Sequence, residues 1–208
     1  MTIRNSNKYV TLVATFHAVT KERIFSFYDK MEEISIDYKQ LIEKSMLKYG
    51  LTIDEAHAVF GYTTRLFYRD LNHALDAKIV SKEALDLASL ITKALEKFPN
   101  SKSSVQYRGW RVKTLTNNSF DEKFAFGKTV TSSFWSTAPT IEDAYPSSRN
   151  VILYTNKAKD ITDIAFGVHF HQLVDKPVYG NETLIPFGVK FKVFGHDANN
   201  RLILKEVI

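Results

Sequence analysis

The chain has 208 residues, a length that predicts one domain, or one domain with a modest extension. Hydrophobic residues make up 44% of it and aromatic residues 13%, enough to fill a core, which excludes an intrinsically disordered chain. The net charge of +5 permits a nucleic-acid partner without requiring one. The absence of cysteine excludes disulfides, thiolate metal sites and a cysteine nucleophile.

The most apolar N-terminal segment, residues 9–16, is short and carries two threonines. It therefore predicts a strand rather than a secretion signal, and no stretch approaches the roughly 20 apolar residues of a membrane span. We expect a cytoplasmic protein without membrane insertion, compatible with later delivery into a target cell.

Helical periodicity runs from about residue 21 to residue 98. One helix is expected to begin near Thr52 or Asp54, either of which suits an N-cap. The clearest amphipathic helix follows Ser81, its predicted cap, and ends before the Pro-Asn pair at 99–100.

After residue 104 the period of the apolar residues changes to two, which predicts strands. The predicted strands are 105–112, 151–154, 183–185 and 189–193. A turn cluster at 196–200 leads into a further apolar segment, 201–207, so the chain is expected to end in a hairpin. Helices followed by a mostly antiparallel sheet predict an α+β fold.

Three polar signals stand out in the strand-rich half: Arg108 in mid-strand, the pair Ser136-Thr137 at the end of an apolar strand, and Glu182 at the opening of another. Taken singly, each has an ordinary explanation: an edge arginine, a local backbone cap and a solvated carboxylate. If the three strands share a face, the same residues could hold a phosphate, a sugar edge and a developing positive charge.

The order and surroundings of these residues resemble the mono-ADP-ribosyltransferase family, in the branch marked by Arg, Ser-Thr and Glu that includes bacterial toxins, phage enzymes and vertebrate ecto-enzymes. Tyr107-Arg108-Gly109 is similar to the family's first-strand arginine motif, and Phe-Trp-Ser-Thr-Ala at 134–138 to its Ser-Thr-Ser strand. The segment 182–193 resembles the catalytic glutamate and the strands after it, and is the most specific part. The likeness covers residues 45–208, including 59–64, 71–75 and 160–162.

The resemblance implies N-terminal helices followed by a mostly antiparallel split β-sandwich of the ADP-ribosyltransferase type, with an NAD cleft. It implies a helical extension over 1–45 and a catalytic domain over 46–208, helical at 46–100 and a sheet at 101–208. The implied activity is that of an NAD-dependent glycosyltransferase, a toxin, effector or phage-encoded modifier that moves ADP-ribose to a macromolecule. A toxin would leave room for an inhibitory partner.

The same resemblance implies a role for each site residue. Arg108 would pair with the phosphates of NAD through its planar fork, and the backbone of Gly109 would approach the nicotinamide amide. Ser136 would orient Glu182 or the nicotinamide ribose, with Thr137 supporting the strand. Glu182 would bind the ribose 2′-hydroxyl and stabilise an oxocarbenium-like sugar, as carboxylates do in glycosidases. No metal is required, and the aromatic rings available to stack on nicotinamide are Trp110, Trp135 and Phe166.

The chain departs from the family pattern at Gly180, where arginine-modifying members carry a Glu and several others a Gln. Arginine modification by the usual route is therefore in doubt. A substitute is expected from the loop predicted over 166–179, which offers His169, His171, Gln172, Asp175 and Tyr179. Ala138, in place of the last Ser of the strand motif, is a minor change.

Alternative functions stay open. Protein is the favoured acceptor, and nucleic acid the second, because the pI is about 9.2 and Lys176, Lys190 and Lys192 could hold phosphates. An NAD glycohydrolase would use water instead, and a catalytically silent binding module would keep only the fold. His169 and His171 share one face if their segment is a strand, but a metal site would need a third ligand in register.

Overall fold

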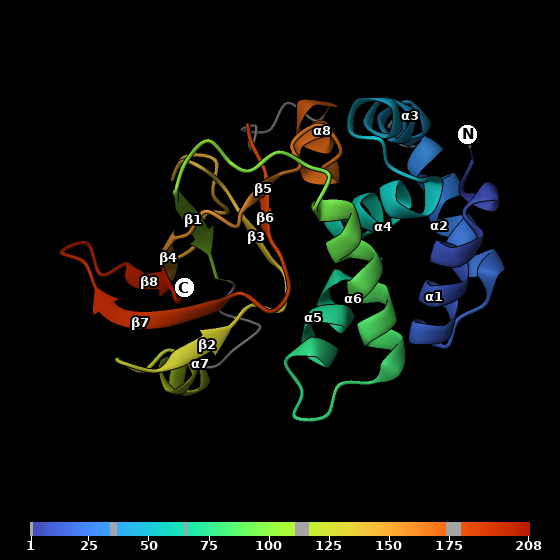
Figure 1. The fold of residues 1–208 in the computed structure, drawn as a ribbon. Helices are drawn as coiled ribbons and strands as arrows, with labels where there is room; N and C mark the ends of the chain where they lie inside the picture. The colour runs from blue at the N-terminus through green and yellow to red at the C-terminus, as the bar shows by residue number, and fades with distance from the viewer. Residues whose placement is uncertain (1, 34–36, 65, 111–116, 174–179) are drawn as a thin grey trace. The chain divides into compact units, whose positions relative to one another are not determined.

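The computed structural model describes residues 2–33, 37–64, 66–110, 117–173 and 180–208. The chain divides into two compact units (Figure 1). The helical unit comprises Met1–Phe98 and Asp163–Lys176, and the β unit comprises Pro99–Thr162 and Pro177–Ile208. The change of period predicted after residue 104 thus falls close to the first boundary. None of the described helices is long and apolar enough to cross a bilayer.

The helical unit is built from short amphipathic helices, of which α4 and α6 pack against α1. Its elements are η1 (Ile3–Asn5), α1 (Asn7–His17), α2 (Lys21–Glu33), α3 (Tyr38–Tyr49), α4 (Ile53–Thr63), α5 (Tyr68–Leu75), α6 (Lys82–Leu95) and α8 (Phe166–Leu173). The helical character predicted for residues 21–98 is confirmed. Residues 1–45 contribute α1, α2 and part of α3 to this same unit.

The strand predicted at 9–16 is wrong, because this segment belongs to helix α1. Its buried side chains are Tyr9, Val10 and Val13, at the three- and four-residue spacing of one helix face. Asp54 of α4 stabilises the first turn, since its Oδ1 accepts hydrogen bonds from the Ser6 hydroxyl (2.9 Å) and the Tyr9 N–H (2.8 Å). Tertiary packing and this distant carboxylate outweigh the strand preference of the β-branched residues.

Two helix starts follow the predicted capping chemistry. Thr52, rather than Asp54, caps α4: its hydroxyl accepts from the Glu55 N–H, and the Glu55 carboxylate accepts from the Thr52 N–H, which makes a capping box. Ser81 caps α6 by accepting from the N–H of Ala84 at 3.2 Å, so this prediction is confirmed.

The β unit contains two sheets. Its elements are β1 (Val105–Gly109), α7 (Asn117–Lys123), β2 (Thr129–Thr131), β3 (Trp135–Thr137), β4 (Asn150–Tyr154), β5 (Lys159–Asp160), β6 (Thr183–Ile185), β7 (Lys190–His196) and β8 (Leu202–Glu206). One sheet has the order β1-β4-β8-β7-β2, and the other has the order β3-β6-β5. Among the described strands only β4 and β8 pair in parallel, so the mostly antiparallel α+β fold is confirmed, as is the C-terminal hairpin of β7 and β8.

The two sheets share one apolar core and are joined at one edge. Trp135 and Ile185 from the smaller sheet pack in a cluster with Val151, Leu153, Phe191, Val193, Leu202 and Leu204 from the larger one. Tyr107 on β1 and Ala138 after β3 exchange two backbone hydrogen bonds, at 2.8 and 2.9 Å. This bridge brings β1 beside β3, and therefore brings the predicted arginine strand beside the predicted Ser-Thr strand.

Candidate active site

Arg108 lies on β1, with its guanidinium directed to the neighbouring strand. Its Nη1 donates to the backbone carbonyl of Ser136 at 2.5 Å, and its Cζ lies 4.7 Å from the centre of the Trp110 ring. The side chain is half-buried, and the cation–π contact holds the planar group against a buried ring. Arg108 therefore stands on an edge strand of the larger sheet, but its head is held by Ser136 and Trp110 rather than lying in water.

Ser136 lies on β3 between the buried side chains of Trp135 and Thr137. Because successive side chains on a strand point to opposite faces, Ser136 is directed away from the core, and it lies close enough to the Glu182 carboxyl to lower the pKa of that group. Its carbonyl binds Arg108. One strand residue thus contacts both of the charged residues predicted for the site.

Thr137 belongs to a buried polar chain that sequence reasoning did not identify. The Thr137 and Thr183 hydroxyls lie 2.7 Å apart, and the Thr183 hydroxyl donates to Oε1 of Gln106 at 2.6 Å. Gln106 is anchored in turn by donating to the Ser101 hydroxyl and the Ser103 carbonyl. The chain links β3, β6 and β1 by side-chain hydrogen bonds, which agrees with a supporting part for Thr137.

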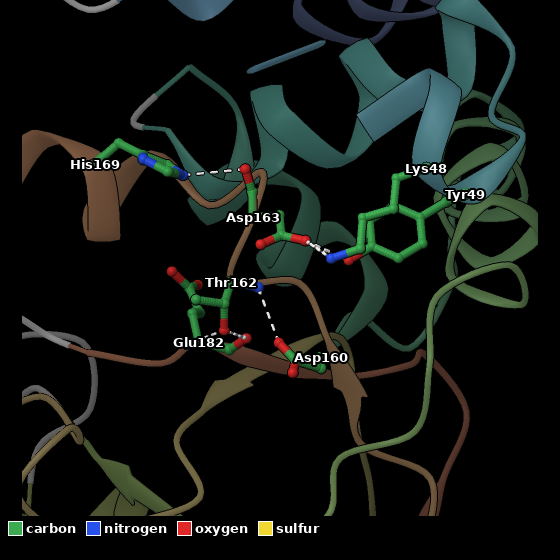
Figure 2. A network of polar contacts seen from close by, with 7 residues as sticks. All are labelled: Lys48, Tyr49, Asp160, Thr162, Asp163, His169 and Glu182. Atoms are coloured by element: carbon green, nitrogen blue, oxygen red, sulfur yellow. Dashed lines mark hydrogen bonds and ion pairs between the residues drawn. The ribbon is translucent and has the colours of Figure 1, made fainter. Parts of the chain in front are cut away.

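Glu182 immediately precedes β6, and its backbone is tied on both sides to Thr162 (Figure 2). Its N–H donates to Thr162 Oγ1 at 3.1 Å, and its carbonyl accepts from the Thr162 hydroxyl at 3.3 Å and from the Ile161 N–H at 3.0 Å. Asp160 holds Thr162 by accepting its N–H at 3.1 Å. The backbone under the carboxylate is therefore fixed.

The environment of Glu182 shifts its acidity. Burial raises the pKa of its carboxyl from the ordinary 4.5 to about 7, although the Ser136 hydrogen bond and the positive charge of Arg108 lower it. A carboxyl group whose pKa is held near neutrality beside a cation is a candidate functional group. Arg108, Ser136 and Glu182, which are remote in sequence, thus meet within the β unit.

Gly109 and Gly180, the two glycines singled out in the sequence, each pack against the loop that follows β3. A Cβ on Gly109 would lie 1.8 Å from the carbonyl oxygen of Tyr145, so this position excludes any larger residue. A Cβ on Gly180 would lie 2.8 Å from Oδ1 of Asp143. Asp143 accepts the Gly180 N–H at 2.8 Å and an Asn181 side-chain N–H at 3.0 Å. No motif in the sequence marks Asp143, which follows β3 by six positions.

The segment predicted as a long loop, 166–179, begins with helix α8, so its first eight residues are wrongly predicted. Residues 174–179, which include Asp175, Lys176 and Tyr179, lie outside the described residues. Positions 169 and 171 lie on a helix rather than a strand, where residues two apart do not face each other. His169 Nε2 lies 3.0 Å from the carbonyl of Asp163 (Figure 2). Among the described residues, no group of three His, Asp or Glu side chains could hold a metal ion.

The three aromatic candidates occupy different surroundings. Trp135 is 1% exposed and stacks on Phe191 in the core, so its ring is committed to packing. Trp110 is 8% exposed and lies under Arg108. Phe166 lies in the helical unit, where its ring contacts Phe60. Lys190 and Lys192 are exposed on β7.

Comparison with known proteins identifies the fold. No protein-family model matches the sequence, and no curated protein sequence matches it. The type III effector XopAI from Xanthomonas axonopodis pv. citri, truncated by 70 N-terminal residues, superimposes with a TM-score of 0.65 at 16% identity, over 100% of this chain and 89% of that one.

Two further structures share the fold. Exoenzyme S from Pseudomonas aeruginosa, in complex with human 14-3-3 protein beta and carba-NAD, gives a TM-score of 0.54 at 16% identity over 82% of this chain and 88% of that one. Vis toxin, an ADP-ribosyltransferase from Vibrio splendidus, gives 0.50 at 19% identity over 85% and 86%. These likenesses confirm the fold predicted from the sequence.

Proposed function

We propose, from the ADP-ribosyltransferase fold that this chain adopts, that it is a mono-ADP-ribosyltransferase that uses NAD as its substrate. It cleaves the glycosidic bond to nicotinamide and transfers ADP-ribose to a macromolecular acceptor. The observation that carries the proposal is the set of groups around one carboxyl: Arg108 binds the Ser136 carbonyl, and Ser136 and Arg108 both lie close enough to Glu182 to lower the pKa of its carboxyl. The carba-NAD complex of Exoenzyme S supports NAD as the substrate.

In the proposed mechanism, Arg108 binds the phosphates of NAD. Guanidinium presents several N–H donors in one plane, which suits two phosphate oxygens at once, and its contacts with Ser136 and Trp110 orient that plane before NAD arrives. Gly109 offers its backbone to the nicotinamide amide. Thr137 keeps β3 in register with β6 through its hydrogen bond to Thr183. No metal takes part.

The reacting bond joins C1′ of the ribose to the ring nitrogen of nicotinamide. As it breaks, its electron pair leaves with nicotinamide, and positive charge develops on the sugar. Ionised Glu182 accepts a hydrogen bond from the 2′-hydroxyl and stabilises that charge, while Ser136 fixes the direction of the carboxylate. A lone pair of the acceptor then bonds to C1′, and the acceptor releases a proton.

The rate is expected to depend on pH through Glu182. Only the ionised carboxylate stabilises the cationic sugar, and its pKa in the free protein is about 7. In a pH profile of nicotinamide release, kcat/KM is expected to rise about tenfold per unit below pH 7 and to level off above it. Circular dichroism at each pH is the control for folding. A flat profile between pH 5 and 8 would contradict this assignment.

The acceptor is proposed to be a protein, with nucleic acid as the second candidate, since Lys190 and Lys192 present charge on β7. When NAD labelled in its adenylate phosphate is incubated with a cell lysate and the purified chain, label is expected to enter macromolecules. Loss of that label on protease treatment indicates protein, and loss on nuclease treatment indicates nucleic acid. The Glu182→Gln variant in parallel excludes non-enzymatic labelling.

An NAD glycohydrolase is the second candidate, and the specific observation that favours it is Gly180, which offers no side chain to orient an acceptor. It predicts nicotinamide release without label in any macromolecule. A catalytically silent binding module predicts neither nicotinamide release nor label in a macromolecule. A toxin or effector delivered into a target cell, with or without an inhibitory partner, is the context that agrees with the transferase proposal.

A further inference from the structure

The chain immediately before Glu182 is held by a carboxylate from another loop. Asp143 Oδ1 accepts the Gly180 N–H at 2.8 Å, and its Oδ2 accepts from Asn181 Nδ2 at 3.0 Å. Each oxygen therefore binds one of two consecutive residues, and the two donors are fixed by a single short side chain. Hydrogen bonds to an ionised carboxylate are stronger than those between neutral groups.

The loop that carries Asp143 contacts the end of β1. Its N–H donates to the Thr140 hydroxyl at 3.3 Å, and two residues later the Tyr145 carbonyl packs against Gly109. Further along the same loop, the Ser147 hydroxyl donates to the Trp110 carbonyl at 2.5 Å. The loop 140–147 therefore connects the segment before Glu182 to the end of the strand that carries Arg108.

Gly180 is matched to this carboxylate. A Cβ at that position would lie 2.8 Å from Asp143 Oδ1, and Asp143 has too few rotatable bonds to withdraw while keeping both hydrogen bonds. The space in which a side chain at position 180 would begin is thus taken by Asp143. Asp143 can therefore bind the backbone at position 180 only because that residue is glycine.

We propose that Asp143 is a positioning residue for Glu182, an inference that rests on the proposed function. The Glu182 carboxylate is held by Ser136, and its backbone by Thr162 from the β5 side. Asp143 supplies the third restraint, on the residues that lead into Glu182. Without it, residues 180 and 181 are free to rotate, and the carboxylate loses its alignment with the reacting sugar. A small misplacement of a catalytic group costs up to about a hundredfold in rate.

The test is a swap of hydrogen-bonding groups, measured as nicotinamide release from NAD by the full chain. Asp143→Ala removes both acceptors, and Asn181→Asp brings two carboxylates together. Each single variant is expected to lower kcat about 10- to 100-fold with KM for NAD unchanged. Asp143→Asn combined with Asn181→Asp places a donor opposite an acceptor again and is expected to recover most of the rate. Glu142→Gln, an exposed neighbour in the same loop, is the matched control and is expected to retain the full rate.

Wild-type kcat in Asp143→Ala, or no recovery in the double variant, would overturn the inference. If Asp143→Ala fails to fold, Asn181→Ala, at an exposed residue, removes the hydrogen bond to Asp143 Oδ2 and must still lower kcat. A second measurement does not depend on catalysis: Asp143→Ala is expected to speed hydrogen exchange of the Gly180 amide. Unchanged exchange would overturn the restraint itself. A wild type that releases no nicotinamide, or that matches Glu182→Gln, would instead refute the proposed function, and the exchange measurement distinguishes the two failures.

Discussion

Replacement of Glu182 by glutamine is expected to lower the rate of nicotinamide release by about two to three orders of magnitude. Glutamine keeps the size of the side chain and one oxygen for the Ser136 hydroxyl, so it removes the negative charge with little change in packing. The rate loss therefore reports the electrostatic stabilisation of the cationic sugar. Chromatographic assay of nicotinamide measures it, and a variant as active as wild type would refute the enzyme proposal.

The same substitution is expected to stabilise the protein above neutral pH. The folded-state pKa of Glu182 is about 7 and its ordinary value is 4.5, so the folded chain holds the proton more tightly than the unfolded chain. The stability due to this proton is present below pH 4.5 and is lost as the pH rises through 7. At about 1.4 kcal/mol per pKa unit, the loss approaches about 3 kcal/mol.

Glutamine carries no such cost, because it does not ionise. In urea unfolding, Glu182→Gln is expected to be more stable than wild type at pH 8, while the difference due to ionisation vanishes near pH 4.5. The comparison between two pH values cancels any difference in packing between the side chains. Equal differences at both pH values would show that burial of the charge is not the cause, and Glu142→Gln serves as the exposed control.

Replacement of Arg108 by alanine is expected to lower kcat/KM for NAD at least a hundredfold, the scale of losing one partner of a desolvated charged contact. The guanidinium binds the Ser136 carbonyl and stacks on Trp110, so it is oriented before the phosphates arrive. Its charge also lowers the pKa of Glu182. The acid limb of the pH profile is therefore expected to move above pH 7 in this variant.

The shift of the acid limb and the fall in kcat/KM distinguish the charge of Arg108 from the planar shape of its guanidinium. Arg108→Lys keeps the charge without the planar fork, so it is expected to leave the acid limb near pH 7 while kcat/KM still falls. Lys102→Ala removes an exposed cation of the same unit and is expected to change neither quantity. An Arg108→Ala variant with an unaltered pH profile would show that its charge does not act on Glu182.

Local patterns in the sequence predict those elements whose own residues carry the information. Ser81 caps α6 because serine and the third following N–H lie within one turn, and the C-terminal hairpin follows from its turn residues. The prediction fails at residues 9–16 because Asp54, 45 positions from Tyr9, supplies the hydrogen bond that starts the helix. The loop predicted at 166–173 is in fact helix α8, because these residues show no distinctive helical pattern in the sequence.

The same distinction applies to the site. Arg108, Ser136 and Glu182 are recognisable because each stands in a motif on a predicted strand. Asp143 has no motif, and its partner is 37 positions away, so only the fold brings the two together. In the sequence Gln106 is an ordinary polar residue of an alternating strand, but in the structure its side chain is fully buried and accepts a hydrogen bond from Thr183. Contacts between residues that lie far apart in the sequence leave no local pattern from which they could be predicted.

The buried hydrogen bonds among Gln106, Thr137 and Thr183 have an evolutionary consequence. These side chains are buried and bond one another, so loss of Thr183 leaves Gln106 Oε1 without its donor at a cost of about 1–3 kcal/mol. Exchange of all three for apolar residues of similar volume removes the cost among the trio itself, although the Ser101 hydroxyl and the Ser103 carbonyl then lose the Gln106 amide. Homologous chains are therefore expected to show covariation at 106, 137 and 183, keeping the polar trio or replacing it as a set.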